Sequence, residues 1–220
     1  MKWPDDYVNK IIHADCMDVM SGIPDRAVDL VLTDPPYGIG TGAFVGGDNA
    51  CKATDYGDFN KWDSEIPKKD VFESFINKSI NQIVWGGNYF VRYLDNSPCW
   101  IVWDKDNSGN FADCELAYTS FRSAVRKIKW RWNGMIQENG GKHKEERYHP
   151  TQKPVALFEW CLNKYSNEGD LILDPFSGSG TTAIACHRLN MRFICIEKEK
   201  SYYESSLKRL KEEQAQMELF

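Results

Sequence analysis

The stretch Asp174-Pro175-Phe176-Ser177-Gly178-Ser179-Gly180-Thr181-Thr182 decides the fold, because it joins a short strand to a helix through two glycines. The apolar run at 171–173 ends in a carboxylate and reads as a buried strand. Apolar residues recur three and four positions apart over 183–189, which predicts a helix. In such a unit the glycines let a ligand approach the backbone, and the helix amides point into the crevice at the strand end.

The same turn disfavours one ligand class and favours another. It lacks the Gly-Lys-Ser/Thr ending of a phosphate-binding P-loop, so a nucleoside triphosphate is disfavoured. Residues 192–197 read as a second strand ending in Glu197, about where a doubly wound unit places its ribose-binding carboxylate. A Gly-x-Gly turn alone is a weak signal, since many such turns only join a strand to a helix. The two features together favour a nucleoside ligand.

A second turn, Asp34-Pro35-Pro36-Tyr37-Gly38, follows an apolar and β-branched strand at 28–33. The two prolines fix their own φ angles and have no amide hydrogens, so they present the neighbouring carbonyls rigidly. An acid, a rigid carbonyl and an aromatic ring are thus held together at a strand end. The plainer alternative is that Asp34 caps a turn and Tyr37 packs at the sheet edge.

With His149-Pro150-Thr151-Gln152-Lys153-Pro154 just before the glycine turn, these motifs resemble those of the β-class amino-group DNA methyltransferases, which use S-adenosylmethionine. The resemblance extends across most of the chain and is weak from residue 39 to residue 148. The alternation of strands and helices predicts an α/β fold with a doubly wound, mainly parallel sheet. The resemblance adds a Rossmann-like methyltransferase fold in which the catalytic motif precedes the cofactor motif, a permuted order.

The resemblance implies direct methyl transfer to the exocyclic amine of a base that is flipped out of double-stranded DNA. The Asp34 carboxylate and the Pro35 carbonyl accept the two amine hydrogens, which weakens conjugation of the nitrogen lone pair and aims it at the methyl carbon. Tyr37 stacks on the base. Pro36 completes the predicted catalytic motif.

The resemblance also assigns cofactor residues. Asp15, at the end of an expected strand at 11–15, receives the adenine amino group of the cofactor, although it also suits the cap of a helix at 16–20. Glu197 accepts from the ribose hydroxyls, and Lys153 contacts the cofactor carboxylate or the neighbouring turn. The other predicted cofactor residues are Asp34, Asp174, Phe176, Ser177, Gly178, Gly180, Thr181 and Thr182.

Adenine is the predicted target base, because family members that act on cytosine more often carry Ser where this chain has Asp34. The exocyclic amine of cytosine is the nearest alternative. A nucleic-acid-binding partner without turnover is the alternative from another class. Methylation at ring carbon five would need a nucleophilic cysteine, and Cys99 instead begins an apolar strand. Glutamine methylation is disfavoured because that family has Asn at the first motif position and the opposite motif order, whereas RNA is left open.

The middle of the chain carries the expected mobile and structural parts. Residues 39–70 are rich in glycine and polar side chains with little periodicity, which predicts a mobile loop. Helical spacing over 71–80 predicts a helix with Ile80 on its apolar face. A strand and turn are expected at 82–88, and further strands at 99–103 and 128–132.

Residues 104–148 form the predicted target-recognition region. Eight Lys/Arg against three Glu lie between Arg122 and Arg147, although the whole chain has a net charge of -5. A solvated strand and loop has the same composition, but beside a base-modifying motif we interpret it as a phosphate-contacting surface. The predicted contacts are Arg122, Arg126, Lys127, Lys129, Arg131, Lys142, Lys144 and Arg147. The small region favours a short recognition site, a second subunit in a homodimer, or modest specificity.

The composition bounds the remaining expectations. A chain of 220 residues with 42% hydrophobic content predicts one domain over 1–220. No apolar run of about 20 residues is present, and the first residues do not form a signal peptide, so a soluble cytoplasmic protein is expected. A bacterial or bacteriophage origin is implied by resemblance only. Seven widely spaced cysteines without a Cys-x-x-Cys pair predict reduced thiols and no metal site.

Two further helices are expected near the end of the chain. Pro154 suits the start of a helix over 155–162 that finishes near 167–169. Residues 201–204 have the spacing of a capping box at the start of the last helix. From residue 212 on, the chain is expected to fray.

Overall fold

The structure is a computed structural model that describes residues 1–39, 65–107, 112–133, 136–139, 145–146, 148 and 151–217. Its elements in chain order are β1 (Lys10–His13), α1 (Cys16–Met20), β2 (Val28–Thr33), α2 (Lys69–Lys78), β3 (Ser79–Trp85), the short 3-10 helix η2 (Gly87–Tyr89), β4 (Trp100–Asp104), β5 (Cys114–Thr119), β6 (Arg126–Lys129), β7 (Trp132–Asn133), β8 (Ile136–Gln137), α3 (Val155–Tyr165), β9 (Leu171–Asp174), α4 (Thr181–Arg188), β10 (Arg192–Glu197) and α5 (Lys200–Met217).

Eight strands form one sheet in the order β1-β10-β9-β2-β3-β5-β4-β6, and β7 pairs with β8 in a separate hairpin. The strands β1, β10, β9, β2 and β3 run parallel to one another, and β6 is parallel to β4. Among the described strands of this sheet, only β5 is antiparallel to the strands on both sides of it, β3 and β4. The sheet is therefore mainly parallel, as predicted.

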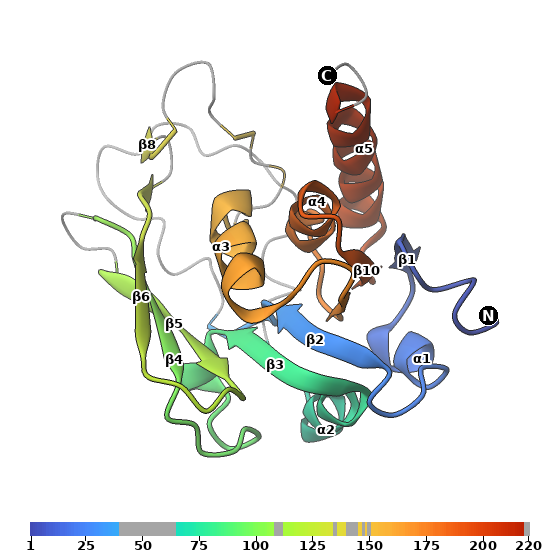
Figure 1. Ribbon diagram of the computed structural model, residues 1–220, viewed down its shortest axis with the longest axis horizontal. Helices are drawn as coiled ribbons and strands as arrows, with labels where there is room; N and C mark the ends of the chain where they lie inside the picture. The colour runs from blue at the N-terminus through green and yellow to red at the C-terminus, as the bar shows by residue number, and fades with distance from the viewer. Residues whose placement is uncertain are drawn as a thin grey trace.

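Helices cover both faces of the sheet: α3, α4 and α5 lie on one face, and α1 and α2 on the other (Figure 1). The strand residues alternate between the two cores that result. Leu30 and Leu32 of β2 pack in the core that includes α3, α4 and α5, whereas Val31 packs in the core that includes α1 and α2. Burial on both faces explains why β2 reads as a near-continuous apolar run.

The boundary between α2 and β3 differs from the prediction. Ser79 already pairs with Val28 of β2, so the helix ends at Lys78 and the strand begins directly. Ile80, predicted on the apolar face of the helix, lies in β3 and is 45% exposed. Of the loop predicted over 39–70, residues 40–64 lie outside the described residues, and the last two residues belong to α2.

The strand predicted over 128–132 is wrong in its second half, because the chain leaves the main sheet after Lys129. The carbonyl of Trp130 accepts the indole N–H of Trp103 at 2.9 Å, and the amide of Arg131 donates to Glu138 Oε2 at 3.2 Å. These bonds turn the chain away from β4 and into the β7–β8 hairpin.

Two more differences concern β5 and α5. The strand β5 was not predicted at all. The helix α5 begins at Lys200, so Ser201 lies inside it and is not an N-cap. Because α5 continues to Met217, most of the tail that was expected to fray is helical.

Candidate active site

The two turns singled out in the sequence lie side by side, because the strands that lead into them are neighbours. β2 and β9 pair in parallel, with Leu30 opposite Ile172 and Val31 opposite Leu173. From this pair the chain proceeds in opposite directions, since β2 is followed by α2 and β3 on one side and β9 by α4 and β10 on the other. Ligands of open α/β sheets bind at such a reversal of strand order, beyond the carboxyl ends of the strands.

Asp174 joins the two turns, and only 2% of the residue is exposed. Its Oδ1 accepts from the Thr33 hydroxyl at 2.7 Å and from the Phe176 amide at 3.1 Å, and its Oδ2 accepts from the Thr182 hydroxyl. Burial raises the pKa of Asp174 to about 6, against the hydrogen bonds from Thr182 and Thr33. Asp174 thus fixes the end of β2, the glycine turn and α4 to one another.

A cavity of about 620 Å³ lies between the two turns. Small-molecule and cofactor sites usually have about 300 to 1,000 Å³. Asp34 and Pro36 of the first turn form part of its wall. The predicted cofactor residues in the wall are Asp15, Asp34, Lys153, Asp174, Phe176, Ser177, Gly178, Thr181, Thr182 and Glu197. Gly180 is not among the lining residues. It is the N-cap of α4 and has a left-handed backbone with φ +79°.

The carboxylate of Glu197 organises the glycine turn. It accepts from the Glu199 amide at 2.7 Å and from the Gly178 amide at 2.8 Å. Burial raises the pKa of Glu197 to about 7, although these two amides lower it. The Ser177 hydroxyl is buried in the same wall and meets no hydrogen-bond partner among the described residues. A buried hydroxyl and a carboxylate with free lone pairs suit a ligand that carries hydroxyl and amino groups.

Asp15 caps α1, which is one of the two interpretations weighed for it. Its Oδ1 accepts from the Met17 amide at 3.0 Å, and its Oδ2 accepts from Lys198 Nζ at 3.0 Å. The hydrogen bond from Lys198, followed by that from Met17, lowers the pKa of Asp15 and keeps it ionised. Because Asp15 also lines the cavity, capping does not exclude a cofactor contact, which stays a prediction.

Asp34 is held by two donors. Lys153 Nζ lies 2.6 Å from Oδ2 of Asp34, and the Tyr37 hydroxyl donates to Oδ1 at 2.6 Å. Burial raises the pKa of Asp34, and the ammonium of Lys153 opposes the rise. Burial and then the Asp34 charge raise the pKa of Tyr37 well above its usual value, so the phenol keeps its proton. Of the two contacts expected for Lys153, with the cofactor carboxylate or with a neighbouring turn, the structure shows a contact with Asp34 of the first turn.

A second carboxylate, Glu115, was not identified from the sequence. Its Oε2 lies 3.1 Å from Lys153 Nζ, and its Oε1 forms a close ion pair with Lys105. Burial disfavours its charge, but Lys153 and then Lys105 lower the pKa of Glu115 to about 2. Burial disfavours the ammonium of Lys153 as well, yet Asp34 and Glu115 together raise its pKa. The negative charges of Asp34 and Glu115 are therefore balanced by the positive charges of Lys153 and Lys105 beside the first turn.

The ring of Tyr37 is fixed by its neighbours. Tyr89 stacks on it with ring centroids 4.8 Å apart and planes inclined by 17°, and Phe90 meets it edge-on at 6.1 Å. Gly86 has φ +66°, and a Cβ there would overlap the Tyr37 ring. Tyr89 is 43% exposed. The stack of two rings thus extends from the protein surface to Asp34.

Comparison with known proteins decides the family. A family profile described as DNA methylase, covering N6 and N4 methyltransferases, matches residues 28–208. The chain belongs to this DNA methylase family. The methylase is 28% identical to the Type II methyltransferase M2.DpnII of Streptococcus pneumoniae, over 94% of the chain and 92% of that protein.

Solved structures confirm the fold. The M1.HpyAVI–SAM complex is similar with a TM-score of 0.57 and 24% identity, over 91% of the chain and 99% of that protein. The PvuII DNA methyltransferase, described as cytosine-N4-specific, is similar with a TM-score of 0.60 and 15% identity, over 91% of the chain and 85% of that protein. The predicted family and the Rossmann-like methyltransferase fold are therefore confirmed.

Three of the predicted DNA-contacting residues of the methylase are paired with acids. Lys127 Nζ lies 3.0 Å from Asp104, and Lys129 Nζ lies 2.8 Å from Asp106. Arg131 forms a close, two-pronged contact with the same Asp106. All three basic side chains remain about half exposed or more, at 64%, 59% and 47%. Phosphate contacts would therefore compete with these pairs.

The other predicted DNA contacts fall into two groups. Arg122 precedes β6 and Arg126 begins it, and both are exposed. Lys142, Lys144 and Arg147 lie outside the described residues. A DNA-contacting role stays a prediction for all of them.

Within the described ranges, no group of three or more His, Cys, Asp or Glu residues is placed to hold a metal ion. That part of the chain also contains no helix with the length and apolar character needed to cross a bilayer. The cysteines among the described residues are free thiols.

Proposed function

We propose that this methylase transfers a methyl group from S-adenosylmethionine to the exocyclic N6 of adenine in double-stranded DNA. The observation that carries the proposal is the shared cavity: Asp34 of the first turn and the glycine turn from Asp174 contribute to one wall. A methyl donor on the glycine turn and an acceptor amine at Asp34 thus fit one space. Membership of the DNA methylase family supports the same reaction.

The cavity residues fit the cofactor by their chemistry. When bound, S-adenosylmethionine supplies an electrophilic methyl group on a sulfonium. Glu197 is suited to accept from ribose hydroxyls, and the unpaired Ser177 hydroxyl to bond the methionine end. The Asp15 carboxylate, held by the α1 amide and Lys198, is suited to accept from the adenine amine of the cofactor. Each contact is a proposal built on the wall of the cavity.

The residues of the first turn act on the target base. The exocyclic amine is a poor nucleophile, since its lone pair is delocalised into the ring. Asp34 and the Pro35 carbonyl accept its hydrogens and orient the lone pair, and the charge that develops on the nitrogen is stabilised by the Asp34 carboxylate. Lys153 holds that carboxylate in place and balances its charge, and Glu115 in turn holds Lys153.

Adenine is proposed over cytosine because of the residue at position 34. In the resembling family, members that act on cytosine more often carry Ser there, and this chain carries Asp34. Fold similarity does not choose between the bases, since the cytosine-N4-specific PvuII enzyme is among the similar structures.

The test is to incubate the protein with labelled S-adenosylmethionine and methylation-free duplex DNA, digest the DNA to nucleosides and identify the labelled nucleoside by liquid chromatography with mass detection. Label on N6 of deoxyadenosine is the expected result. Label on N4 of deoxycytidine would replace the base and keep the mechanism. Cofactor binding by calorimetry with no label on any nucleic acid would instead support the non-catalytic alternative.

Asp34→Ala is expected to lower methyl transfer by at least roughly 10²- to 10³-fold, the usual loss when a group that stabilises the transition state is removed. Cofactor binding should be retained, because the other residues of the cavity wall are intact and Lys153 keeps Glu115 as its partner. Asp25→Ala is the matched control, since Asp25 is a 72% exposed acid paired with Lys78 and lies outside the cavity wall. Unchanged turnover in Asp34→Ala would overturn the mechanism.

A further inference from the structure

The side chain of Arg209 on α5 is buried against the glycine turn, and nothing in the sequence singled it out. Only 7% of the residue is exposed. Its Nη1 donates to the Ser179 carbonyl at 3.2 Å, to the Ser179 hydroxyl at 3.3 Å and to the Thr181 hydroxyl at 3.2 Å. Ser179 and Thr181 both line the cofactor cavity. One side of the guanidinium therefore fixes the shape of the turn on which the cofactor is proposed to bind.

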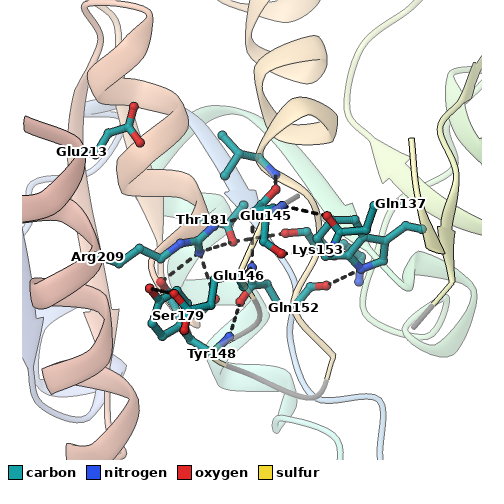
Figure 2. A network of polar contacts seen from close by, with 12 residues as sticks. Gln137, Glu145, Glu146, Tyr148, Gln152, Lys153, Ser179, Thr181, Arg209 and Glu213 are labelled. Carbon is teal, nitrogen blue, oxygen red and sulfur yellow. Dashed lines mark hydrogen bonds and ion pairs between the residues drawn. The ribbon is translucent and has the colours of Figure 1, made fainter. Parts of the chain in front are cut away.

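The other side of the same guanidinium binds Glu145. Arg209 Nη2 forms a close ion pair with Glu145 Oε1, and the guanidinium carbon lies 5.6 Å from the Tyr148 ring centroid (Figure 2). Glu145 Oε2 accepts from the amide of Val155, the first residue of α3, at 3.1 Å. Because Pro154 provides no side-chain cap for α3, Glu145 supplies that cap from outside the helix.

Glu145 belongs to a small network within the predicted target-recognition region. We call Gln137 together with residues 145, 146 and 148 the recognition segment. The Gln137 side chain donates to the Glu145 carbonyl at 2.9 Å and accepts from its amide at 2.8 Å. Gln152 donates to Glu145 Oε1 and to the Glu146 carbonyl, and it accepts from the Tyr148 amide at 2.9 Å. The recognition segment is thus tied to the residue that precedes Lys153 of the active site.

We infer that Arg209 is a positioning residue that couples the glycine turn to the recognition segment, so that filling the cofactor cavity further stabilises the segment that is predicted to meet DNA. The inference rests on the proposed function, since it takes the ligand of the turn to be S-adenosylmethionine.

The physical reason for the coupling is that the buried guanidinium of Arg209 binds both the glycine turn and Glu145. A guanidinium has five donors and no acceptor, so it has to be surrounded by acceptors when buried. Here these acceptors come from the glycine turn and from Glu145. A shift of the turn therefore moves the guanidinium, and Glu145 has to follow, because leaving either charge buried without its partner is costly.

Hydrogen exchange with mass detection tests the coupling without requiring DNA or turnover. Arg209→Lys keeps the positive charge but loses the planar fork that reaches both sides. Arg188→Lys is the matched control, because Arg188 makes an equally forked contact with Glu213, at 2.6 and 2.8 Å, away from the cavity. Each protein is measured with and without S-adenosylmethionine.

In the native protein and in Arg188→Lys, the cofactor is expected to slow exchange in peptides over 174–182 and also in peptides that cover Gln137 and Glu145, by about fivefold or more, the lower end of usual coupling. In Arg209→Lys, the first effect should remain and the second should be lost.

Three outcomes would overturn the inference. If the cofactor protects the glycine turn of the native protein but not the recognition segment, the coupling is absent while the proposed function stands. Protection of both segments in Arg209→Lys would show that the coupling does not pass through this residue. If even the glycine turn is unprotected in the native protein, the cofactor does not bind there, and the proposed function falls together with the inference.

Discussion

Tyr37 and Lys153 each hold one oxygen of Asp34, the carboxylate that is proposed to accept from the target amine. The phenol donates to Oδ1 at 2.6 Å while its ring stacks on Tyr89. The amine therefore competes for the lone pairs of Oδ1 with a hydrogen bond to a charged group, which is worth about 1.5 to 3 kcal/mol when it is lost completely. The ring and the hydroxyl of Tyr37 thus have opposite effects on turnover.

Tyr37→Phe is accordingly expected to raise kcat/KM for DNA, by roughly two- to tenfold, because it frees Asp34 and leaves the ring in place. Tyr37→Ala removes the stacking surface as well, which is worth about 1 to 3 kcal/mol per base, and should lower kcat/KM. Steady-state kinetics with labelled cofactor measure both variants. A large loss of activity in Tyr37→Phe would show that the hydroxyl takes part in the reaction and does not block it.

If Glu197 binds the cofactor ribose as proposed, it links cofactor binding to pH. Its pKa is raised to about 7 by burial, so without cofactor its ionisation costs stability. The free energy of unfolding is therefore highest while Glu197 is protonated, below its unfolded pKa near 4.5. It falls by roughly 3 kcal/mol as the pH rises from there through about 7. Ribose hydroxyls that donate to Glu197 would favour the carboxylate and lower its pKa.

Cofactor binding near pH 6.5 is therefore expected to release a proton, and affinity should rise with pH up to about 7, the pKa of Glu197. Calorimetry in two buffers of different ionisation enthalpy measures the proton count. Glu197→Gln should bind more weakly and without this buffer dependence. Proton uptake, or a pH-independent affinity of the native protein, would contradict the ribose contact.

At the scale of single residues, the sequence identified reactive side chains at the ends of strands. It did not identify the residues that contact them only in the folded structure. Asp34, Tyr37 and Glu197 could be found because each ends or follows an apolar run of the chain. Glu115 could not, since it reaches Lys153 only because β5 inserts antiparallel beside β3. Arg209 likewise resembles any basic residue on an amphipathic helix, and its burial depends on a tertiary contact with Glu145.

At the scale of elements, the start of α4 depends on Gly180. This residue has φ +79°, and a Cβ there would lie 2.9 Å from the Cβ of Ser206 on α5. Gly178 has φ +50°, but a Cβ there would meet no atom within 4 Å. The two glycines thus differ in the space around them and share a left-handed backbone.

Gly180→Ala is expected to lower the free energy of unfolding by roughly 2 to 4 kcal/mol, because it combines backbone strain with a collision against α5. Gly178→Ala should lose only about 1 to 2 kcal/mol, the cost of the left-handed backbone. Urea unfolding at fixed pH compares the two variants. Equal losses would mean that α5 yields to the added methyl group and that its packing on the turn is not tight.

The boundaries of helices and strands were predicted correctly where turn residues end the element. The predictions were wrong where a tertiary contact, such as pairing with a neighbouring strand, ends it. The strand at 28–33 and the helix at 16–20 agree with β2 and α1, since turn residues bound them. The end of α2 was misplaced because apolar spacing continues to Ile80, whereas pairing of Ser79 with Val28 already starts β3. The exit from β6 likewise depends on the indole of Trp103, which no local pattern contains.

At the scale of the whole molecule, the order of the strands in the sheet could not be predicted from the residue pattern alone. Alternating helices and strands predicted a parallel sheet, but the pairing of β2 with β9, which brings Asp34 beside Asp174, joins segments far apart in the chain. That order was available only through resemblance of the motifs to a family. The same sheet decides which basic residues can face DNA at the active site.

The direction of β6 separates the predicted DNA contacts. β6 is parallel to β4, and Lys129 at its carboxyl end lies opposite Asp104. β4 in turn runs in the same direction as β3, because both are antiparallel to β5. Lys129 and the following Arg131 therefore lie toward the edge of the sheet where Asp34 is found. Arg126 starts β6, roughly 10 Å earlier at about 3.3 Å per residue.

Lys129→Ala with Arg131→Ala is therefore expected to weaken binding to duplex DNA and to flatten its salt dependence, by roughly 0.9 in the log–log slope for each phosphate that is no longer neutralised. Arg122→Ala with Arg126→Ala removes the same charge farther from Asp34 and should change the slope less. Fluorescence anisotropy from about 50 to 200 mM salt measures both.

Because Asp106 holds Lys129 and Arg131 in the free protein, Asp106→Asn should strengthen binding. Equal slopes for both double variants would show that neither pair is favoured by its place in the sheet, and the basic residues between 142 and 147 would then be the next to substitute.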